Sequence, residues 1–135
     1  MRIMAGLALA LLSSTHAHAQ LKNALLCSED VSIKFKEHAA ADGSLVNIIA
    51  GRRFSLVWND DYLNLISAGK TEFYECQKIK PRLNEGGPKN SIKCQNGIYF
   101  VTIDLSKLNF VRSTLDPQTR ANVEVAYGGC KPIGN

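Results

Sequence analysis

The sequence predicts an all-β protein: a small antiparallel barrel or sandwich of about seven or eight strands, stapled by disulfides. Three features support this prediction. Short runs alternate apolar and polar residues, turn-forming residues separate these runs, and four cysteines are widely spaced along the chain. The chain has 135 residues, of which 45% are hydrophobic and 21% are charged. It therefore has the length of one domain and is too apolar for an intrinsically disordered protein.

The first 19 residues have the pattern of a signal peptide. Arg2 precedes an uncharged run over 3–12, and residues 17–19 form an A-x-A cleavage motif. The alternative is a buried N-terminal helix. The apolar run is shorter than the roughly 20 residues that cross a bilayer as a helix. We therefore expect an exported protein, periplasmic or extracellular, that does not span a membrane and has a single β domain over 20–135.

Eight segments carry strand signals, either period-2 alternation or enrichment in β-branched and aromatic residues: 31–35, 53–58, 62–66, 71–76, 91–94, 98–103, 108–111 and 122–127. Turn-forming residues at 59–61, 67–70 and 96–97 predict hairpins between neighbouring strands. The longest loop is expected over 80–90, where apolar periodicity is lost. The segment Lys36–Asp42 is expected to be a connecting turn, because one or two helical turns are marginal alone.

Apolar side chains of these segments are expected to fill the interior. They are Phe54, Leu56, Trp58, Leu63, Leu65, Phe73, Phe100, Ile103, Phe110, Val123 and Val125. The only tryptophan, Trp58, is expected in the core or at its edge rather than on a ligand platform, because large aromatic side chains dominate cores.

The four cysteines are expected to form two disulfides in an oxidising compartment. They are Cys27, Cys76, Cys94 and Cys130. A zinc site is not expected, since no C-x-x-C pair occurs and His38 is the only histidine left after cleavage. Three pairings are possible. A faint internal repeat, in which each half opens and closes with a cysteine, favours Cys27–Cys76 with Cys94–Cys130.

The sequence offers little that predicts catalysis, and we expect a protein that is not an enzyme and holds no cofactor or metal. His38 lies in a connecting segment, and no G-x-S-x-G motif would position a serine beside it. The adjacent carboxylates Asp60 and Asp61 fall in a predicted turn, where aspartate serves a local structural purpose. No G-x-G-x-x-G phosphate loop occurs.

Positive charge is concentrated around the predicted long loop. Residues 78–93 contain five basic residues and one acidic residue, Glu85, and so account for the whole formal net charge of +4. The basic residues are Lys78, Lys80, Arg82, Lys89 and Lys93. They predict binding of an anionic partner, such as an anionic envelope polymer, a lipid headgroup or an acidic protein face; the alternative is a solvated loop. Nucleic acid is not expected, because the protein is exported and the segment lacks aromatic residues for base stacking.

The overall plan resembles that of small periplasmic β-barrel proteins of proteobacteria, and within that group the C-type lysozyme inhibitors. The resemblance is carried by the signal peptide, the alternating strands, Tyr74-Glu75-Cys76 and the Gly-Gly-Cys sequence that ends at Cys130. Those inhibitors insert a serine-glycine loop, followed by a lysine, into the lysozyme cleft. Ser67-Ala68-Gly69-Lys70 is similar to that loop, although the longer serine- and glycine-rich pattern is missing.

Two functions are therefore predicted. The first is a non-enzymatic binding module of unknown ligand, which contacts anionic envelope components chiefly through the basic segment and secondarily through Ser67 and Lys70. The second is an inhibitor of a lysozyme-like hydrolase, which acts through the turn from Ser67 to Lys70.

Overall fold

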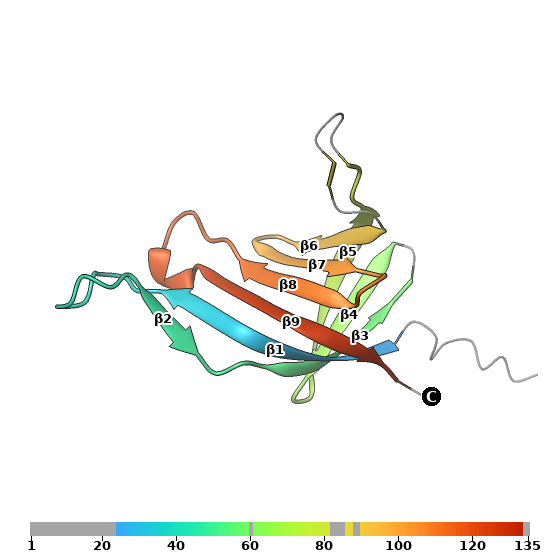
Figure 1. Cartoon of the computed structure of the whole chain (residues 1–135), viewed down its shortest axis with the longest axis horizontal. Helices are drawn as coiled ribbons and strands as arrows, with labels where there is room; N and C mark the ends of the chain where they lie inside the picture. The colour runs from blue at the N-terminus through green and yellow to red at the C-terminus, as the bar shows by residue number, and fades with distance from the viewer. Residues whose placement is uncertain (1–23, 60, 82–85, 88–89, 134–135) are drawn as a thin grey trace, which may run out of the picture.

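The computed structural model describes residues 24–59, 61–81, 86–87 and 90–133. Its elements are β1 (Ala24–Phe35), β2 (Val46–Ile49), β3 (Arg53–Trp58), β4 (Tyr62–Ser67), β5 (Lys70–Lys78), β6 (Ser91–Asn96), β7 (Tyr99–Asp104), β8 (Asn109–Thr114), the 3-10 helix η2 (Arg120–Asn122) and β9 (Glu124–Pro132) (Figure 1). Neighbouring strands are antiparallel, and β1 also pairs with β9. Strands β1 and β3 to β9 thus close an eight-stranded barrel, which confirms the predicted fold class as a barrel, and β2 is an additional strand.

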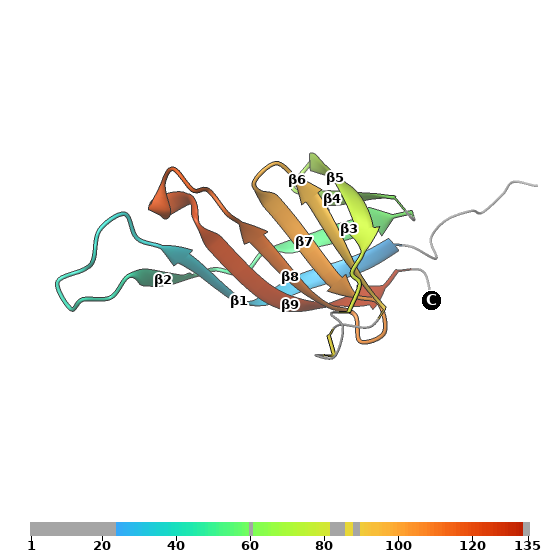
Figure 2. The ribbon, with the colours of Figure 1, turned by 90° about the horizontal axis from the view of Figure 1, so that it is seen from above.

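Strand β1 runs past the end of the barrel. Its first half pairs with β3 and its second half with β2, while β9 follows its other edge throughout. Figures 1 and 2 show β2 and the adjoining ends of β1 and β9 projecting beyond β4 to β7. At the other end of β1, the N–H of Ile133 donates to the carbonyl of Ala24 over 3.1 Å. The first and last described strands therefore meet there.

The core lies inside the barrel and follows the period-2 alternation of the strands. Its fully buried members include Phe54, Leu56, Leu63, Leu65, Ile103 and Phe110, all of them predicted. Trp58 is half-buried and packs against this cluster, as expected of a residue at the core edge.

Some predicted core residues face outward instead. Phe73 is half exposed, because its neighbours Tyr74 and Cys94 occupy the interior across the β5–β6 pair. The remaining ones, Phe100, Val123 and Val125, are only partly buried. Where two apolar residues are adjacent, as Phe73 and Tyr74 are, the alternation does not show which of them faces the core. Phe73 was expected in the core, whereas the structure places Tyr74 there.

The two disulfides correct the predicted pairing. They join Cys27 to Cys130 and Cys76 to Cys94, and no free cysteine remains in the described chain. In each case the two cysteines lie directly opposite each other on neighbouring antiparallel strands. The expected pairing of Cys27 with Cys76 assumed two separate halves. The barrel instead closes by pairing β1 with β9, which brings Cys27 beside Cys130.

The turns occur largely where the sequence placed them. Ala68 and Gly69 both have positive φ, 46° and 76°, as a two-residue type I′ hairpin loop requires. At the β6–β7 hairpin the positive φ falls on Gly97, and Asn96 pairs with Tyr99. Residues 36–45 form an irregular connection, which confirms a turn there. Strand β2 and the first half of β1 were not predicted, because neither shows clear alternation.

The chain at two glycines, Gly51 and Gly128, lies very close to the backbone of Ser28 and Glu29. A Cβ at Gly51 would lie 2.4 Å from the carbonyl oxygen of Glu29, and one at Gly128 would lie 2.0 Å from that of Ser28. The β1–β9 register shifts immediately after Glu29, at a β-bulge. These close contacts hold Glu29 in place between β9 and the chain that enters β3.

Gly128→Ala is expected to lower the free energy of unfolding by about 1–3 kcal/mol, because the new methyl group would displace backbone in a packed sheet. Urea unfolding measures the loss. The matched control is Gly129→Ala, whose Cβ would meet its nearest atom only at 3.8 Å. Equal stability of the two variants would contradict the close approach at Gly128.

Candidate functional site

One end of the barrel is open and polar. It holds a cavity of about 580 Å³ lined by residues of β5, β6, β7, β8 and β9 and by Arg52, which precedes β3. The lining includes Arg52, Lys70, Glu72, Tyr74, Tyr99 and Glu124. A smaller hollow of about 220 Å³ shares Tyr99 and Glu124 and adds Lys34 from β1. We call these two adjoining spaces the mouth.

A buried ion-paired triad forms the floor of the mouth. Arg112 donates through Nε to Oε2 of Glu29, and through Nη2 to Oε1 of Glu124 over 2.8 Å. The side chain of Glu29 is 0% exposed and that of Arg112 is 6% exposed. Burial alone would lower the pKa of Arg112, but the hydrogen bonds and charges of the two glutamates raise it above its usual value. The guanidinium therefore remains charged.

Strand alternation explains how the triad reaches the interior. Phe110 faces the core from β8, so Arg112, two residues later, also points inward at the level where the core ends. Glu124 faces the interior from the start of β9, where it is paired with Thr114 and lies diagonally across from Arg112 in the β8–β9 pair. Side chains from β1, β8 and β9 thus bring three charges together inside the barrel.

Arg52 connects the triad to the β4–β5 turn. Its backbone N–H donates to Oε1 of Glu29 over 2.9 Å, and its guanidinium donates to the hydroxyl of Ser67 over 2.9 Å. Lys70 pairs with Ser67 across the type I′ turn and lines the mouth. The side-chain amine of Lys70 makes no hydrogen bond or ion pair with any residue that the structure describes. It is therefore available to a bound group.

Tyr74 and Glu72 form the wall on β5. The Tyr74 hydroxyl donates to Oε2 of Glu72 over 3.1 Å, and the ring is buried. Burial, followed by the charge and hydrogen bond of Glu72, raises the pKa of Tyr74 well above its ordinary value of 10.0, against the opposing effect of Arg112 and Arg52. Tyr74 is therefore a neutral hydrogen-bond donor at physiological pH.

The raised pKa of Tyr74 predicts alkaline sensitivity. Above about pH 10 the unfolded chain releases this proton while the folded chain retains it, so the stability contribution is lost as pH rises toward the folded-state pKa. Tyr74→Phe is expected to lose less stability than the unaltered protein over this range. Urea unfolding at several alkaline pH values measures the slopes. Tyr127→Phe, at a half-exposed tyrosine, is the control, and equal slopes for the two variants would contradict the assignment.

Aromatic rings lie at the rim of the mouth. Tyr99 lines the cavity and is 47% exposed, whereas Phe73, which is 50% exposed, borders both this cavity and the hollow on the outer surface. The Phe73 ring also contacts the ring of Tyr62, with centroids 5.1 Å apart. The mouth thus combines hydrogen-bond donors, carboxylate acceptors and accessible aromatic faces.

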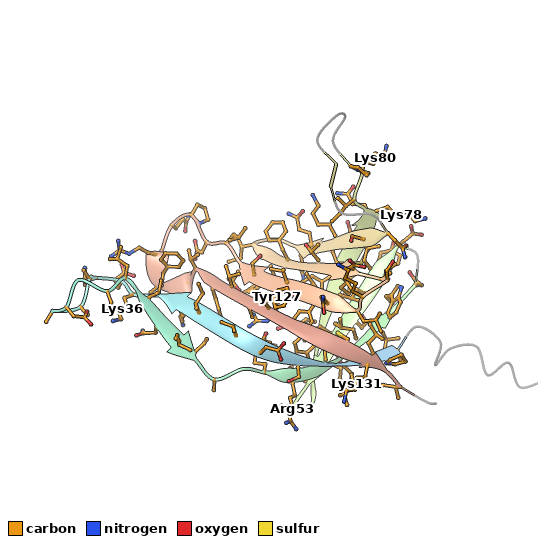
Figure 3. All side chains as sticks on the ribbon, in the orientation of Figure 1. Lys36, Arg53, Lys78, Lys80, Tyr127 and Lys131 are labelled. Carbon is orange, nitrogen blue, oxygen red and sulfur yellow. A yellow bond between two sulfur atoms is a disulfide. The ribbon has the colours of Figure 1, made fainter. Side chains whose placement is uncertain are left out.

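The residues predicted from sequence lie in two separate places. Ser67 and Lys70 belong to the rim of the mouth. Lys78 ends β5 at the opposite end of the barrel, about 26 Å along the strand from Lys70. Figure 3 shows Lys78 and Lys80 together at the base of the long connection between β5 and β6.

The remaining basic residues do not join the mouth either. Lys93 lies on the outer surface of β6, in a shallow hollow that Glu75 and Gln77 also line. Arg82 and Lys89 lie outside the described residues. The structure therefore divides the predicted binding residues, and the role of the basic segment stays a prediction.

No protein family, curated protein or solved structure matches this chain. The resemblance to C-type lysozyme inhibitors therefore still depends on the residues named above and stays a prediction. Among the described residues we find no apolar helix of transmembrane length. No group of three or more potential metal-ligating side chains occurs among the described residues.

Sequence reasoning did not identify the triad of Glu29, Arg112 and Glu124. One signal was available for Arg112, which comes two residues after Phe110 and one residue beyond the predicted strand 108–111, so that a longer strand would have placed both side chains on the same face. Glu29 offered no such signal, because its segment was not predicted to be a strand. Its partner is 83 residues away in sequence and meets it only through barrel closure.

Proposed function

We propose that this protein is an exported, non-enzymatic binding module that holds a saccharide ligand in the mouth of the barrel. The observation that carries the proposal is the charged triad built into the floor of the mouth. A small barrel can fill its interior with apolar side chains, and replacing a buried ion pair with apolar residues is often neutral or stabilising. Arg112 and Glu124 also line the cavity, so two of the three charges lie where a polar ligand would contact them.

The chemistry of the mouth suits a hydroxylated ring. Guanidinium and ammonium groups of Arg52 and Lys70 donate hydrogen bonds, whereas the carboxylates of Glu72 and Glu124 accept them from ligand hydroxyls. The exposed ring of Tyr99 offers an apolar face on which a sugar ring can pack. The cavity of about 580 Å³ falls within the range of small-molecule sites, about 300–1,000 Å³.

Isothermal titration calorimetry with neutral and acidic mono- and disaccharides tests the proposal. At least one saccharide is expected to bind, and Glu72→Gln is expected to weaken it about tenfold or more, because hydrogen bonds to charged groups contribute about 1.5–3 kcal/mol. Glu75→Gln is the matched control, since Glu75 lies on the same strand but lines the hollow on the outer surface. The absence of saccharide binding, or equal loss in both variants, would contradict the proposal.

The turn from Ser67 to Lys70 supports a second candidate function, inhibition of a lysozyme-like hydrolase. Ala68 and Gly69 at its tip are exposed, and the Lys70 amine is free to enter a partner's cleft. This function expects dose-dependent loss of lysozyme activity that Lys70→Ala abolishes. Saccharide binding by the mouth without any effect on lysozyme would favour the binding module.

A further inference from the structure

The outer surface of β8, β9, β1, β2 and β3 carries exposed apolar side chains in one half and basic side chains in the other, and we call it the outer wall. Its rows follow from the strand register. Val111, Tyr127 and Val31 form one row across β8, β9 and β1. Ile33 and Ile48 continue the next row onto β2. Near the other end, Leu26 lies opposite Lys131.

One half of the outer wall is apolar and accessible. Ile48 is 82% exposed, Val31 is 54% exposed, and Tyr127 and Val111 also remain accessible. The opposite face of the same strands carries Glu124 and Lys34, which belong to the mouth. The projecting strands thus place polar side chains inward and apolar side chains outward. Contiguous exposed apolar patches of this kind mark interaction sites.

The other half of the outer wall is basic. Arg53, Lys107 and Lys131 surround a hollow of about 510 Å³, with Asp30 as the single acidic side chain that lines it. The side chains of these three cations make no hydrogen bond or ion pair with any residue in the described ranges. Figure 3 shows Arg53 and Lys131 below the β1–β9 pair and far from Lys78 and Lys80.

We propose that the outer wall docks this protein on the surface of an anionic phospholipid bilayer. The three cations meet lipid phosphates, while Tyr127, Val31 and Ile48 enter the interfacial region beside them. Basic side chains near an anionic leaflet each strengthen binding, and tyrosine is favoured at the membrane interface. The proposal concerns the outside of the barrel and does not depend on what the mouth binds.

Charge decides between a bilayer and a second copy of the chain. In a two-fold pairing of outer walls, the basic half would face either the other basic half or the apolar half. Neither arrangement offers Arg53, Lys107 and Lys131 more than the single carboxylate of Asp30 from the other copy. An anionic lipid surface satisfies the cations and the apolar side chains together.

Co-sedimentation with vesicles tests the proposal, with the processed chain isolated from the exported fraction. Vesicles that contain phosphatidylglycerol are expected to bind the protein, more weakly as salt rises, whereas pure phosphatidylcholine vesicles are not. Arg53→Ala with Lys131→Ala is expected to reduce the partition coefficient about tenfold or more. Val31→Ser with Tyr127→Ser is expected to weaken binding similarly.

The matched control is Lys78→Ala with Lys80→Ala, which removes the same charge from the end of β5 and the connection after it, away from Arg53 and Lys131 (Figure 3), and is expected to change binding less than twofold. Thermal melts confirm that each variant is folded. Equal loss in the control and the Arg53–Lys131 variant would overturn the proposal, and so would binding to phosphatidylcholine alone. A lipid-free dimer that Ile48→Ser dissociates would also overturn it, because a second copy would then cover the wall.

Discussion

Arg112→Met is expected to destabilise the barrel by about 3–5 kcal/mol, which is the usual cost of removing one partner of a buried ion pair. The methionine fills much of the same volume, but it leaves the fully buried carboxylate of Glu29 without its cation. Urea unfolding measures the effect, and an unchanged m-value would show that the loss lies in stability alone.

Two further variants test whether the loss of stability comes from the unpaired charge of Glu29 or from a loss of packing. Arg53→Met changes an exposed arginine on the outer surface and is expected to cost less than about 0.5 kcal/mol. Glu29→Gln combined with Arg112→Met removes both charges and is expected to be more stable than Arg112→Met alone. A cost below about 1 kcal/mol for Arg112→Met would refute the role of the triad described here.

Loss of the disulfide between Cys27 and Cys130 is expected to have an effect of similar size. This bridge spans 103 residues, whereas the bridge between Cys76 and Cys94 spans 18. In the chain-entropy description, a bridge over about 100 residues contributes about 4.7 kcal/mol and one over about 15 residues contributes about 3 kcal/mol. Replacing Cys27 and Cys130 by alanine is thus expected to lower the melting temperature by roughly 15–20 °C for a domain of this size.

The second pair of cysteines supplies the control for this prediction. Alanine at both Cys76 and Cys94 is expected to reduce the melting temperature less than alanine at Cys27 and Cys130. Peptide mapping without reduction is expected to recover the two pairs that the structure describes. Recovery of a peptide that links Cys27 to Cys76 would contradict the barrel closure, because those residues lie on strands that do not pair.

The strands between residues 53 and 114 could be predicted because local signals agree there. Alternation, β-branched residues and turn formers each mark Phe54, Leu56, Leu63 and Leu65 as one buried face. The partner of β1 could not be predicted in the same way. Pairing of β1 with β9 joins segments about 100 residues apart, and no local pattern records which distant strand closes a barrel.

The mouth was predicted only at its rim. Ser67 and Lys70 drew attention as turn residues, and the turn does lie beside the cavity. Glu29 and Glu124 are single carboxylates that form no recognisable motif in the sequence. They become part of a site only because the fold brings both of them to Arg112. By contrast, a run of lysines is conspicuous in sequence, yet Lys78 and Lys93 point to different surfaces of the folded barrel.

The hydrogen bond between Ile133 and Ala24 has a practical consequence for engineering. Because these two residues touch, a linker of a few residues could connect them and yield a circular permutant of the barrel. New ends could open in the irregular connection near Gly43, which is exposed and lies outside every strand. Such a permutant would keep all barrel pairings, and it would move fused reporters to the tip of the projecting strands.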